Sequence, residues 1–317
     1  NWSAQLPHAM VRLPALPEWV WLAGLMGVLL LLLPRGIPGR PLGLLLMAPM
    51  LLHQPARISP GSLHFTLLDV GQGLSIVLES AGHVLVYDTG PAYASGFNAA
   101  ESVLIPFLRS RGIDHVDLLI VSNGDQDHAG GVEPLRKNLE LGRILSGEPA
   151  AFANAEPCRA GMHWIWDGVA FELLHPDSRE DYSQANDLSC VLRVSTTGGI
   201  LLLPGDVQRA AEERLVRVYD EKLRADILVA PHHGSNTSSS PAFVRKVDPD
   251  YVLFATGYRN RFGFPRPAVL SRWRDAGAQL YDSARTGAIE FRLLTGEPLD
   301  GPSLYRQRHP HYWSKDE

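Results

Sequence analysis

The first part of the chain consists of two long apolar blocks separated by a short polar break. Residues 19–33 read WVWLAGLMGVLLLLL without a charge, and residues 41–52 read PLGLLLMAPMLL. A spanning helix needs about 20 apolar residues, so either block alone is also compatible with a buried core helix. Two Leu-rich blocks joined by a PRGIPGRP turn, with Trp19 and Trp21 placed for an interface, favour a membrane hairpin. We therefore predict a membrane segment of two apolar helices over residues 1–56.

Basic residues near the blocks predict how the hairpin is oriented. The turn carries Arg35 and Arg40, whereas Arg12 and Arg57 lie outside the blocks. The positive-inside rule places the turn in the cytoplasm, so we expect the following domain to be extracytoplasmic. The blocks lack the single apolar core and the small-residue cleavage site of a signal peptide. The start at Asn1 rather than Met predicts a fragment of a longer polytopic protein.

From residue 61 onward, short apolar segments alternate with helical ones. LHFTLLDV, SIVLES and HVLVYDTG have the character of strands, and residues 99–112 have helical apolar spacing with a Gly stop. HVDLLIVS is predicted to be a buried strand, and it leads into the loop NGDQDHAGG. The first half of the domain therefore runs from a group of strands through a helix to a strand and a polar loop.

A second series of segments repeats this order. VAFELLHP, SCVLRVS and GILLLPGD are predicted strands, followed by a charged helix over residues 207–223, the strands DILVAPHHGS and YVLFATG, and a helix near residues 268–276. The repetition predicts an α/β domain over residues 61–296, with two sheets face to face and helices outside. Residues 297–317 lack periodicity and are predicted to form a partly disordered tail.

Composition limits the function classes. With 317 residues and 45% hydrophobic content, the chain can bury a real core. The net charge of -5 leaves no overall footprint for nucleic acid, so any such binding must come from local patches. Cys158 and Cys190 are too few for a disulfide scaffold. Outside the cytoplasm they can form one disulfide, and two buried thiols are the equal alternative.

Asn, Asp and His side chains lie at the ends of three predicted strands. They are Asn123, Asp125, Asp127 and His128 in the first loop, Asp206 after the second strand, and His232 and His233 after the third. Taken singly, such residues are ordinary solvated turns or hydrogen-bonded histidines. Carboxylate and imidazole together suit Zn, Mn or similar ions, and the shared position at strand ends predicts a site for divalent metal.

Seven stretches of the domain carry a family resemblance. They are LLDVGQG, YDTG, SNGDQDHAGG, NDLSCVLR, LLPGDV, PHHGSNTS and GYRNRFGFPRP, within roughly residues 65–290. Together they resemble the metallo-β-lactamase fold, an αββα sandwich, and more specifically the C-terminal domain of the ComEC-type competence proteins, which are bacterial DNA-uptake channels. The apolar blocks before the domain resemble the end of that family's channel region.

The resemblance implies a membrane-tethered hydrolase that degrades the non-transported strand of incoming DNA. One or two ions of Zn or Mn would activate water and neutralise phosphate charge. The implied partners are single-stranded DNA, the membrane and other DNA-uptake components. The implied location is the inner membrane, as a multi-pass protein with this domain in the periplasm.

The resemblance also implies roles for individual residues. The implied metal ligands are Asp125, Asp127, His128, Asp206, His232 and His233, with Asp127 and Asp206 also catalytic, and Asp69 and Asp88 orienting the ligands. Two departures stand out: Asn123 replaces a His ligand, and Gly263, Phe264 and Pro265 replace a G-H-P sequence. Because an amide oxygen is a weaker ligand than imidazole, one metal position is expected to be impaired.

Substrate binding is assigned to polar and aromatic loops. The loop YRNRFGFPR interleaves arginines with aromatic rings, and the polar loop from Ser235 can donate to phosphate oxygens. Alternatively, Phe262 and Phe264 pack inward while the arginines lie in water. The candidate substrate-binding residues are Asn186, Ser189, Ser235, Tyr258, Arg259, Arg261 and Arg266.

Three functions therefore remain open. The first is a membrane-tethered nuclease, and the second is a catalytically weakened domain that binds DNA or supports the channel. The third is a metallo-hydrolase of small substrates, which the apolar hairpin and the Arg-aromatic loop disfavour because such enzymes need neither.

Overall fold

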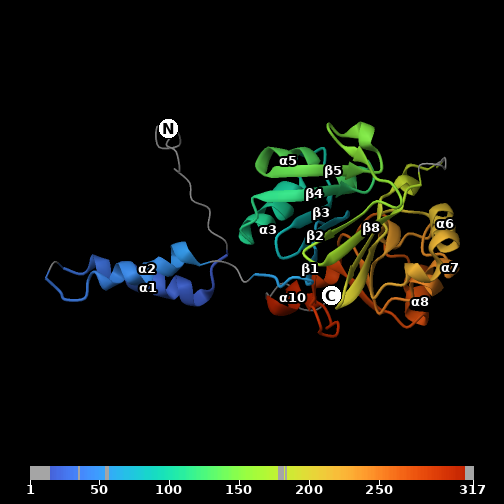
Figure 1. Ribbon diagram of the computed structural model, residues 1–317. Coiled ribbons are helices and arrows are strands. Elements are labelled where there is room, and N and C mark those ends of the chain that lie inside the picture. Colours follow the sequence, from blue (N-terminus) through green and yellow to red (C-terminus); the bar gives the residue numbers. More distant parts are fainter. Residues whose placement is uncertain (1–14, 35, 54–56, 178–181, 183, 311–317) are drawn as a thin grey trace. The chain divides into compact units, whose positions relative to one another are not determined.

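The computed structural model describes residues 15–34, 36–53, 57–177, 182 and 184–310. The chain forms two compact units (Figure 1). The first unit consists of Asn1–Arg57 and Pro106–Asp114, and the second consists of Ile58–Ile105 and His115–Glu317. Arg12 and Arg35, which entered the predicted orientation, lie outside the described residues, as do residues 311–317 of the predicted tail.

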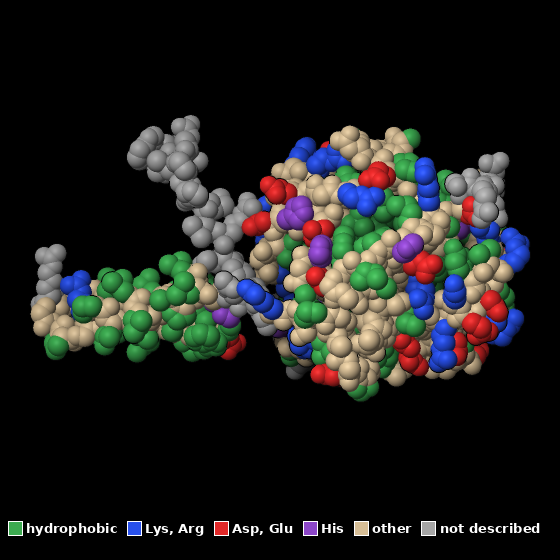
Figure 2. All heavy atoms as spheres, viewed as in Figure 1, with side chains coloured by type: hydrophobic (Ala, Val, Ile, Leu, Met, Phe, Trp, Pro, Cys, Tyr) green, Lys and Arg blue, Asp and Glu red, His purple; other side chains and the backbone are tan. Residues whose placement is uncertain are grey.

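In the first unit, two apolar helices pack as a hairpin. α1 spans Glu18–Leu32 and α2 spans Leu42–Leu52. Their backbones meet at Gly27 and Gly43, where a Cβ on Gly27 would lie 2.5 Å from the Gly43 carbonyl oxygen, so the contact requires glycine. Figure 2 shows that hydrophobic side chains dominate the visible surface of both helices.

The predicted transmembrane hairpin is not confirmed. Within the described ranges, no helix combines the length and the apolar character needed to cross a bilayer. The reason is local: α1 has 15 residues and ends just before Pro34, and α2 has 11 and contains Pro49.

The second unit is built on two sheets, and the first has the strand order β15-β14-β1-β2-β3-β4-β5-β6. Its strands are β1 Leu63–Leu67, β2 Ser75–Glu79, β3 Val84–Thr89, β4 His115–Val121, β5 Glu140–Ser146, β6 Glu156–Pro157, β14 Ile289–Leu293 and β15 Ser303–Leu304. Pairing is antiparallel from β15 to β3 and parallel from β3 to β6.

The second sheet has the order β13-β12-β11-β10-β9-β8-β7. Its strands are β7 His163–Trp166, β8 Val169–His175, β9 Val191–Thr196, β10 Gly199–Leu203, β11 Ile227–Val229, β12 Tyr251–Phe254 and β13 Gln279–Asp282. Strands β10 to β13 are parallel, so their carboxyl ends lie along one edge. Both sheets thus combine an antiparallel meander with a parallel half.

Helices lie outside the sheets, as predicted (Figure 1). In the second unit they are the π-helical turn η2 Ala100–Leu104, α4 Gln126–Ala129, α5 Val132–Asn138, α6 Arg209–Tyr219, α7 Pro241–Val247, α8 Pro267–Asp275, α9 Ser283–Thr286 and α10 Tyr305–Arg308, while α3 Ile105–Ser110 belongs mostly to the first unit. Short 3₁₀ turns are η3 Pro149–Ala151, η4 Ala185–Leu188, η5 Asp220–Leu223 and η6 Pro231–Gly234. The buried faces of α6, α7 and α8 form one apolar cluster with the outer face of the second sheet.

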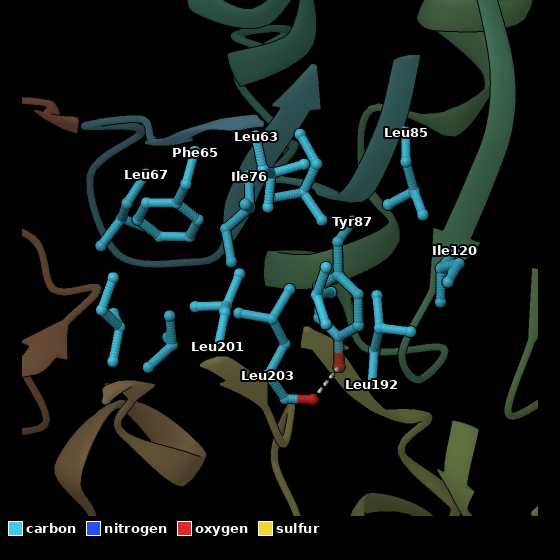
Figure 3. Packing of buried hydrophobic residues seen from close by; sticks show 14 of the residues in the cluster. Leu63, Phe65, Leu67, Ile76, Leu85, Tyr87, Ile120, Leu192, Leu201 and Leu203 are labelled. Carbon is cyan, nitrogen blue, oxygen red and sulfur yellow. Dashed lines mark hydrogen bonds between the residues drawn. The ribbon is translucent and has the colours of Figure 1, made fainter. Parts of the chain in front are cut away.

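The main core lies between the sheets. Alternate residues of β1, such as Phe65 and Leu67, point into it together with Leu201 and Leu203 of β10. Figure 3 shows the side chains of the two sheets facing each other, with the Tyr87 hydroxyl reaching across. That hydroxyl donates to the Cys190 carbonyl oxygen over 2.5 Å, which satisfies a buried polar group inside the core.

The structure departs from the predicted elements mainly at their ends. The charged helix predicted over 207–223 is α6 followed by η5, with a break at Asp220, whose φ is 45°. Ordered structure also extends into the predicted tail, since β15 pairs with β14 through Leu304 and Ile289. A strand of two residues is too short to produce an alternating pattern, so it could not be predicted from periodicity.

A disulfide joins Cys158 and Cys190, which decides between the two alternatives for the cysteines. Cys158 follows β6 in the first sheet, and Cys190 precedes β9 in the second. The bond therefore ties the two sheets together at one end of the core.

We expect that removing this disulfide destabilises the second unit. For cysteines 32 positions apart, constraint of the unfolded chain is worth about 3–4 kcal/mol. Urea unfolding of the double variant Cys158→Ala/Cys190→Ala should show a correspondingly lower midpoint, and wild type in reductant should behave in the same way. Equal midpoints for the oxidised wild type and the double variant would contradict the stabilising role.

Candidate metal centre

Three loops from the carboxyl ends of strands meet at one point. The loop after β4 leads into α4, which carries Asp127 and His128; Asp206 follows β10; and His233 lies in η6 after β11. Because β4 belongs to the first sheet and β10 and β11 belong to the second, the site lies at the carboxyl ends of strands from both sheets.

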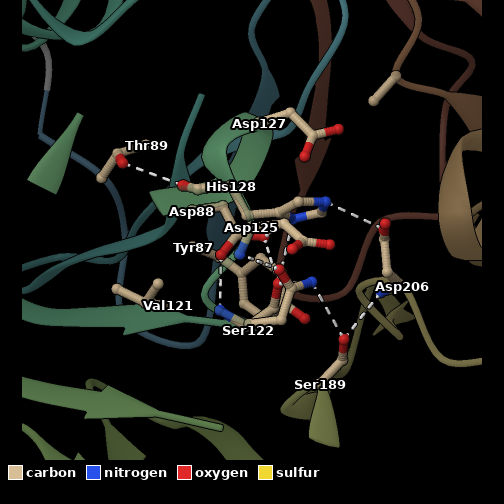
Figure 4. A network of polar contacts seen from close by, with 12 residues as sticks. Tyr87, Asp88, Thr89, Val121, Ser122, Asp125, Asp127, His128, Ser189 and Asp206 are labelled. Atoms are coloured by element: carbon tan, nitrogen blue, oxygen red, sulfur yellow. Dashed lines mark hydrogen bonds and ion pairs between the residues drawn. The ribbon is translucent and has the colours of Figure 1, made fainter. Parts of the chain in front are cut away.

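Asp127, His128 and His233 each offer a ligand atom, and these atoms all lie within 4.8 Å of one another. His128 Nε2 lies 3.3 Å from His233 Nε2, which in turn lies 3.4 Å from Asp127 Oδ2. The two imidazoles are buried, whereas the Asp127 side chain is 32% exposed. Figure 4 shows the Asp127 carboxylate beside the His128 ring. The group is therefore reached from solvent on the Asp127 side.

Asp206, which follows β10 of the second sheet, lies against the two imidazoles of the group. Its Oδ1 lies 3.1 Å from His128 Nε2 and 3.6 Å from His233 Nε2. Within the described residues this buried oxygen accepts no hydrogen bond, although it lies at ion-pair distance from His128 Nε2. A buried carboxylate oxygen that accepts no hydrogen bond and faces two imidazole nitrogens fits a bound divalent cation, which would satisfy all three.

The charges of the group are strongly coupled. Burial alone would lower the pKa of His128, but the carboxylates of Asp206 and Asp88 outweigh it and hold that pKa well above its usual range. Burial would likewise raise the pKa of Asp206, yet the charges of His128 and His233 hold it far below the usual value. A cation entering the site would take the place of the imidazole protons, so metal binding should release protons.

Asp88 orients His128. Its Oδ2 lies 2.7 Å from His128 Nδ1, and the same carboxylate accepts hydrogen bonds from the Ser122 backbone N–H at 2.6 Å and the Ser122 hydroxyl at 2.7 Å. With Nδ1 held in this way, Nε2 is the atom presented to the group. The Thr89 hydroxyl also donates to the His128 carbonyl oxygen, which fixes the backbone of α4.

The two neighbouring histidines differ in role. His233 Nδ1 donates to the Ala255 carbonyl oxygen over 2.8 Å, which directs its Nε2 into the group. His232 is more exposed, its Nδ1 pairs with the Thr237 hydroxyl, and its Nε2 lies 3.7 Å from Asp206 Oδ2. Their φ values, 50° and 53°, are left-handed, a conformation uncommon outside glycine and often retained at functional sites. The geometry favours His233 as the ligand.

Asn123 is buried but does not face the group as a ligand would. Its Oδ1 accepts from the Asp125 backbone N–H at 2.9 Å, and its Nδ2 donates to the Ser189 hydroxyl at 3.3 Å. That hydroxyl also accepts from the Asp206 backbone N–H at 3.1 Å (Figure 4). Asn123 therefore ties the two ligand loops together through Ser189, and its amide oxygen is used within its own loop.

Two predicted site residues are outside the group of ligand atoms found among the described residues. Asp125, at the start of α4, is exposed but close to the group: burial and the nearby Asp127 carboxylate raise the pKa of Asp125, and the charge of His128 opposes them. Asp69 was expected to orient a ligand, but its carboxylate pairs with Arg306 at 3.0 Å. Sequence spacing could not reveal this pairing, because Arg306 lies in the predicted tail.

The predicted substrate residues fall into two classes. Ser189 and Ser235 are buried, and Ser235 pairs with the Thr237 hydroxyl, so neither is presented to solvent as a phosphate donor. Asn186 is half-buried in η4. The exposed members lie on the loop that follows β12, and they are Tyr258, Arg259, Arg261 and Arg266. Reasoning from sequence missed Ser122, whose only signal was its place at the end of β4.

Comparison with known proteins agrees with this geometry. Residues 68–258 match the family described as the metallo-beta-lactamase superfamily. The chain is 37% identical to Competence protein ComA of Neisseria gonorrhoeae over 316 residues, which is 99% of the chain and 44% of that protein. It is 32% identical to Recombination protein 2 of Haemophilus influenzae, over 72% of the chain and 28% of that protein.

Further matches are more distant. ComE operon protein 3 of Bacillus subtilis is 29% identical, over 71% of the chain and 32% of that protein. The chain thus spans less than half the length of these relatives. The solved metallo-beta-lactamase fold protein YhfI from Bacillus subtilis aligns with a TM-score of 0.49 at 11% identity, over 72% of the chain and 99% of that protein.

We predict that the neighbouring histidines contribute unequally to metal binding. His233→Ala should lower the affinity for Zn or Mn at least about a hundredfold, because losing a ligand should cost no less than losing a residue that supports one. His232→Ala, the matched control, should cost less than about tenfold. Titration of the metal-stripped chain by calorimetry measures both. A larger loss in His232→Ala than in His233→Ala would reverse the assignment.

Proposed function

The chain belongs to the metallo-β-lactamase superfamily, and from this we propose that it is a metal-dependent phosphodiesterase domain of a DNA-uptake protein. The observation that carries the proposal is the convergence of Asp127, His128, Asp206 and His233 from both sheets. The names of two relatives, Competence protein ComA and Recombination protein 2, supply the biological context.

The proposed chemistry is hydrolysis of a phosphodiester bond. A divalent cation bound there would supply Lewis-acid activation of water and neutralise charge on the phosphate. Asp127, His128 and His233 would hold it, with Asp206 closing the group. Asp88 keeps His128 Nε2 directed at the centre, and the partly exposed Asp127 leaves one side open for the scissile group. In this proposal the substrate is the strand of incoming DNA that is not transported.

We further propose that the domain works outside the cytoplasm, attached to the inner membrane through the α1–α2 hairpin beside other uptake components. Two observations support this. The Cys158–Cys190 disulfide fits an oxidising compartment. In addition, leucines of the hairpin such as Leu22 and Leu25 are 65% and 58% exposed, an apolar surface that lipid would cover.

A second candidate is a domain that binds DNA but cleaves it weakly. It is favoured by one observation: Asn123, which stands where the family has a His ligand, uses its amide for hydrogen bonds to Ser189 and to the Asp125 backbone. Only one metal position then has a full set of ligands. A domain with one such position could retain DNA binding, or support the channel, after losing most of its activity.

Cleavage of labelled single-stranded DNA in Mn or Zn tests the nuclease proposal. Asp127→Ala should lower the rate at least about a hundredfold, because the metal supplies several kcal/mol of transition-state stabilisation. Asp275→Ala is the matched control, since Asp275 is exposed on α8, and it should leave the rate unchanged. Cleavage by Asp127→Ala at the wild-type rate would refute the proposed centre.

The same assay separates the two candidates. Tight DNA binding by wild type without cleavage in either metal would support the weakened domain. In that case Asn123→His should raise both the metal count and the cleavage rate if position 123 is a lost ligand. Asn123→Leu, which removes the bond to Ser189 without adding a ligand, controls for disruption of the loop.

Flotation with phospholipid vesicles tests the membrane proposal. The full chain should float with the vesicles, and Leu25→Glu/Leu29→Glu should abolish flotation because buried charge is disfavoured in lipid. Val218→Glu, at an exposed apolar position of α6, is the matched control. Equal flotation of all three proteins, or of none, would argue against attachment through the hairpin.

A further inference from the structure

The loop that follows β12 carries a ladder of planar side chains. The rings of Phe262 and Phe264 stack with centroids 5.5 Å apart and an angle of 17° between their planes. The guanidinium of Arg261 lies 4.8 Å from the Phe262 centroid, and that of Arg266 lies 5.6 Å from the Phe264 centroid. We name these four residues the Arg–Phe ladder. Of the alternative in which both rings pack inward and the arginines lie in water, the exposed arginines and the half-buried Phe264 agree with the structure, whereas Phe262 is exposed.

The ladder leads from solvent to the metal centre. Phe262 is 40% exposed, whereas Phe264 is half-buried. The Phe264 ring contacts the His232 ring edge-on, with centroids 5.9 Å apart, and His232 Nε2 lies 3.7 Å from Asp206 Oδ2. The side chains of Phe262, Phe264 and His232 therefore form a continuous path from the exposed ring to Asp206.

Hydrogen bonds hold the ladder in place. Asn260 accepts from the Phe264 backbone N–H at 2.9 Å and donates to its carbonyl oxygen at 2.7 Å. The Arg266 backbone N–H donates to the Gly234 carbonyl oxygen at 3.0 Å, which fastens the loop to η6 beside the histidines. Gly263 has a φ of 64°, which glycine adopts without steric cost. The loop is thus ordered in advance of any ligand.

The chemistry of the ladder selects a flat, anionic ligand. Aromatic rings bind the face of a nucleobase in a sequence-independent way, and guanidinium groups neutralise the adjacent phosphates. Bases in a duplex are already stacked and paired, so their faces are not available to the Phe262 ring. Small anionic substrates, by contrast, have no use for an exposed ring that is flanked by cations.

We propose that the Arg–Phe ladder is a base-stacking platform that holds an unpaired nucleotide on the approach to the metal centre and thereby restricts the site to single-stranded DNA. This inference rests on the proposed function and assigns its strand selectivity to Phe262 and Phe264. Phe262 acts as a binding residue, and Asn260 positions it through the loop backbone.

Binding of fluorescent oligonucleotides to the full chain, followed by anisotropy in EDTA so that no cleavage occurs, tests the proposal. Phe262→Leu should weaken binding of an oligothymidylate at least about fivefold, the lower end of the effect of losing one stacked base. Tyr305→Leu removes an exposed aromatic ring from α10 and is the matched control, with no expected change. On an oligomer of abasic residues, the loss from Phe262→Leu should fall below about twofold.

Two outcomes would overturn the platform. One is equal weakening of the thymidylate and abasic oligomers by Phe262→Leu, which would mean that the ring does not contact bases. The other is wild-type affinity for a duplex equal to that for the single strand. Neither outcome depends on cleavage, so failure of the platform is distinguishable from failure of the nuclease proposal, which the Asp127→Ala rate decides separately.

Discussion

The chain of buried contacts from Asp88 through His128 to Asp206 is the interaction on which the site depends. Asp88 lies at the end of β3 in the first sheet, His128 on α4, and Asp206 after β10 in the second sheet. Two carboxylates can stay buried here because the imidazoles of His128 and His233 can compensate their charges. The two sheets must therefore pack in one relative position, because a small shift of one sheet against the other would leave a buried charge without its partner.

Contacts in the core hold the two sheets in this relative position. Tyr87 and Asp88 are consecutive in β3, and alternation sends the tyrosine between the sheets while the aspartate reaches the ligand loop. The Tyr87 hydroxyl bonds to the carbonyl of Cys190, the residue whose disulfide crosses to the first sheet. The hydroxyl of Ser189, the residue before Cys190, accepts a hydrogen bond from the Asp206 backbone N–H. Packing and ligand placement are thus joined over a few residues.

The sequence was sufficient for the two-sheet architecture of the second unit and for much of the site, because both follow from patterns along the chain. Buried strands ending in Asp or His predicted where Asp127, His128 and Asp206 come together. The direction of the side chains could not be predicted from the sequence. The left-handed backbone of η6 determines which of His232 and His233 points into the group, and no periodicity in the sequence encodes that turn. The role of Asn123 also depends on Ser189, which is distant in sequence. The pairing of Asp69 with Arg306 could not be predicted either, because Arg306 belongs to a segment without a recognisable pattern.

The position of the disulfide has a consequence for when the domain becomes competent to act. Cys190 adjoins Ser189, so the covalent link sits one residue from the hydrogen bond that holds the Asp206 backbone. A newly made chain in a reducing compartment would lack this covalent link, and packing and polar contacts such as that from Tyr87 to Cys190 would hold its sheets together. Under the proposed function, the covalent link beside the metal centre would form only when the domain reaches an oxidising compartment.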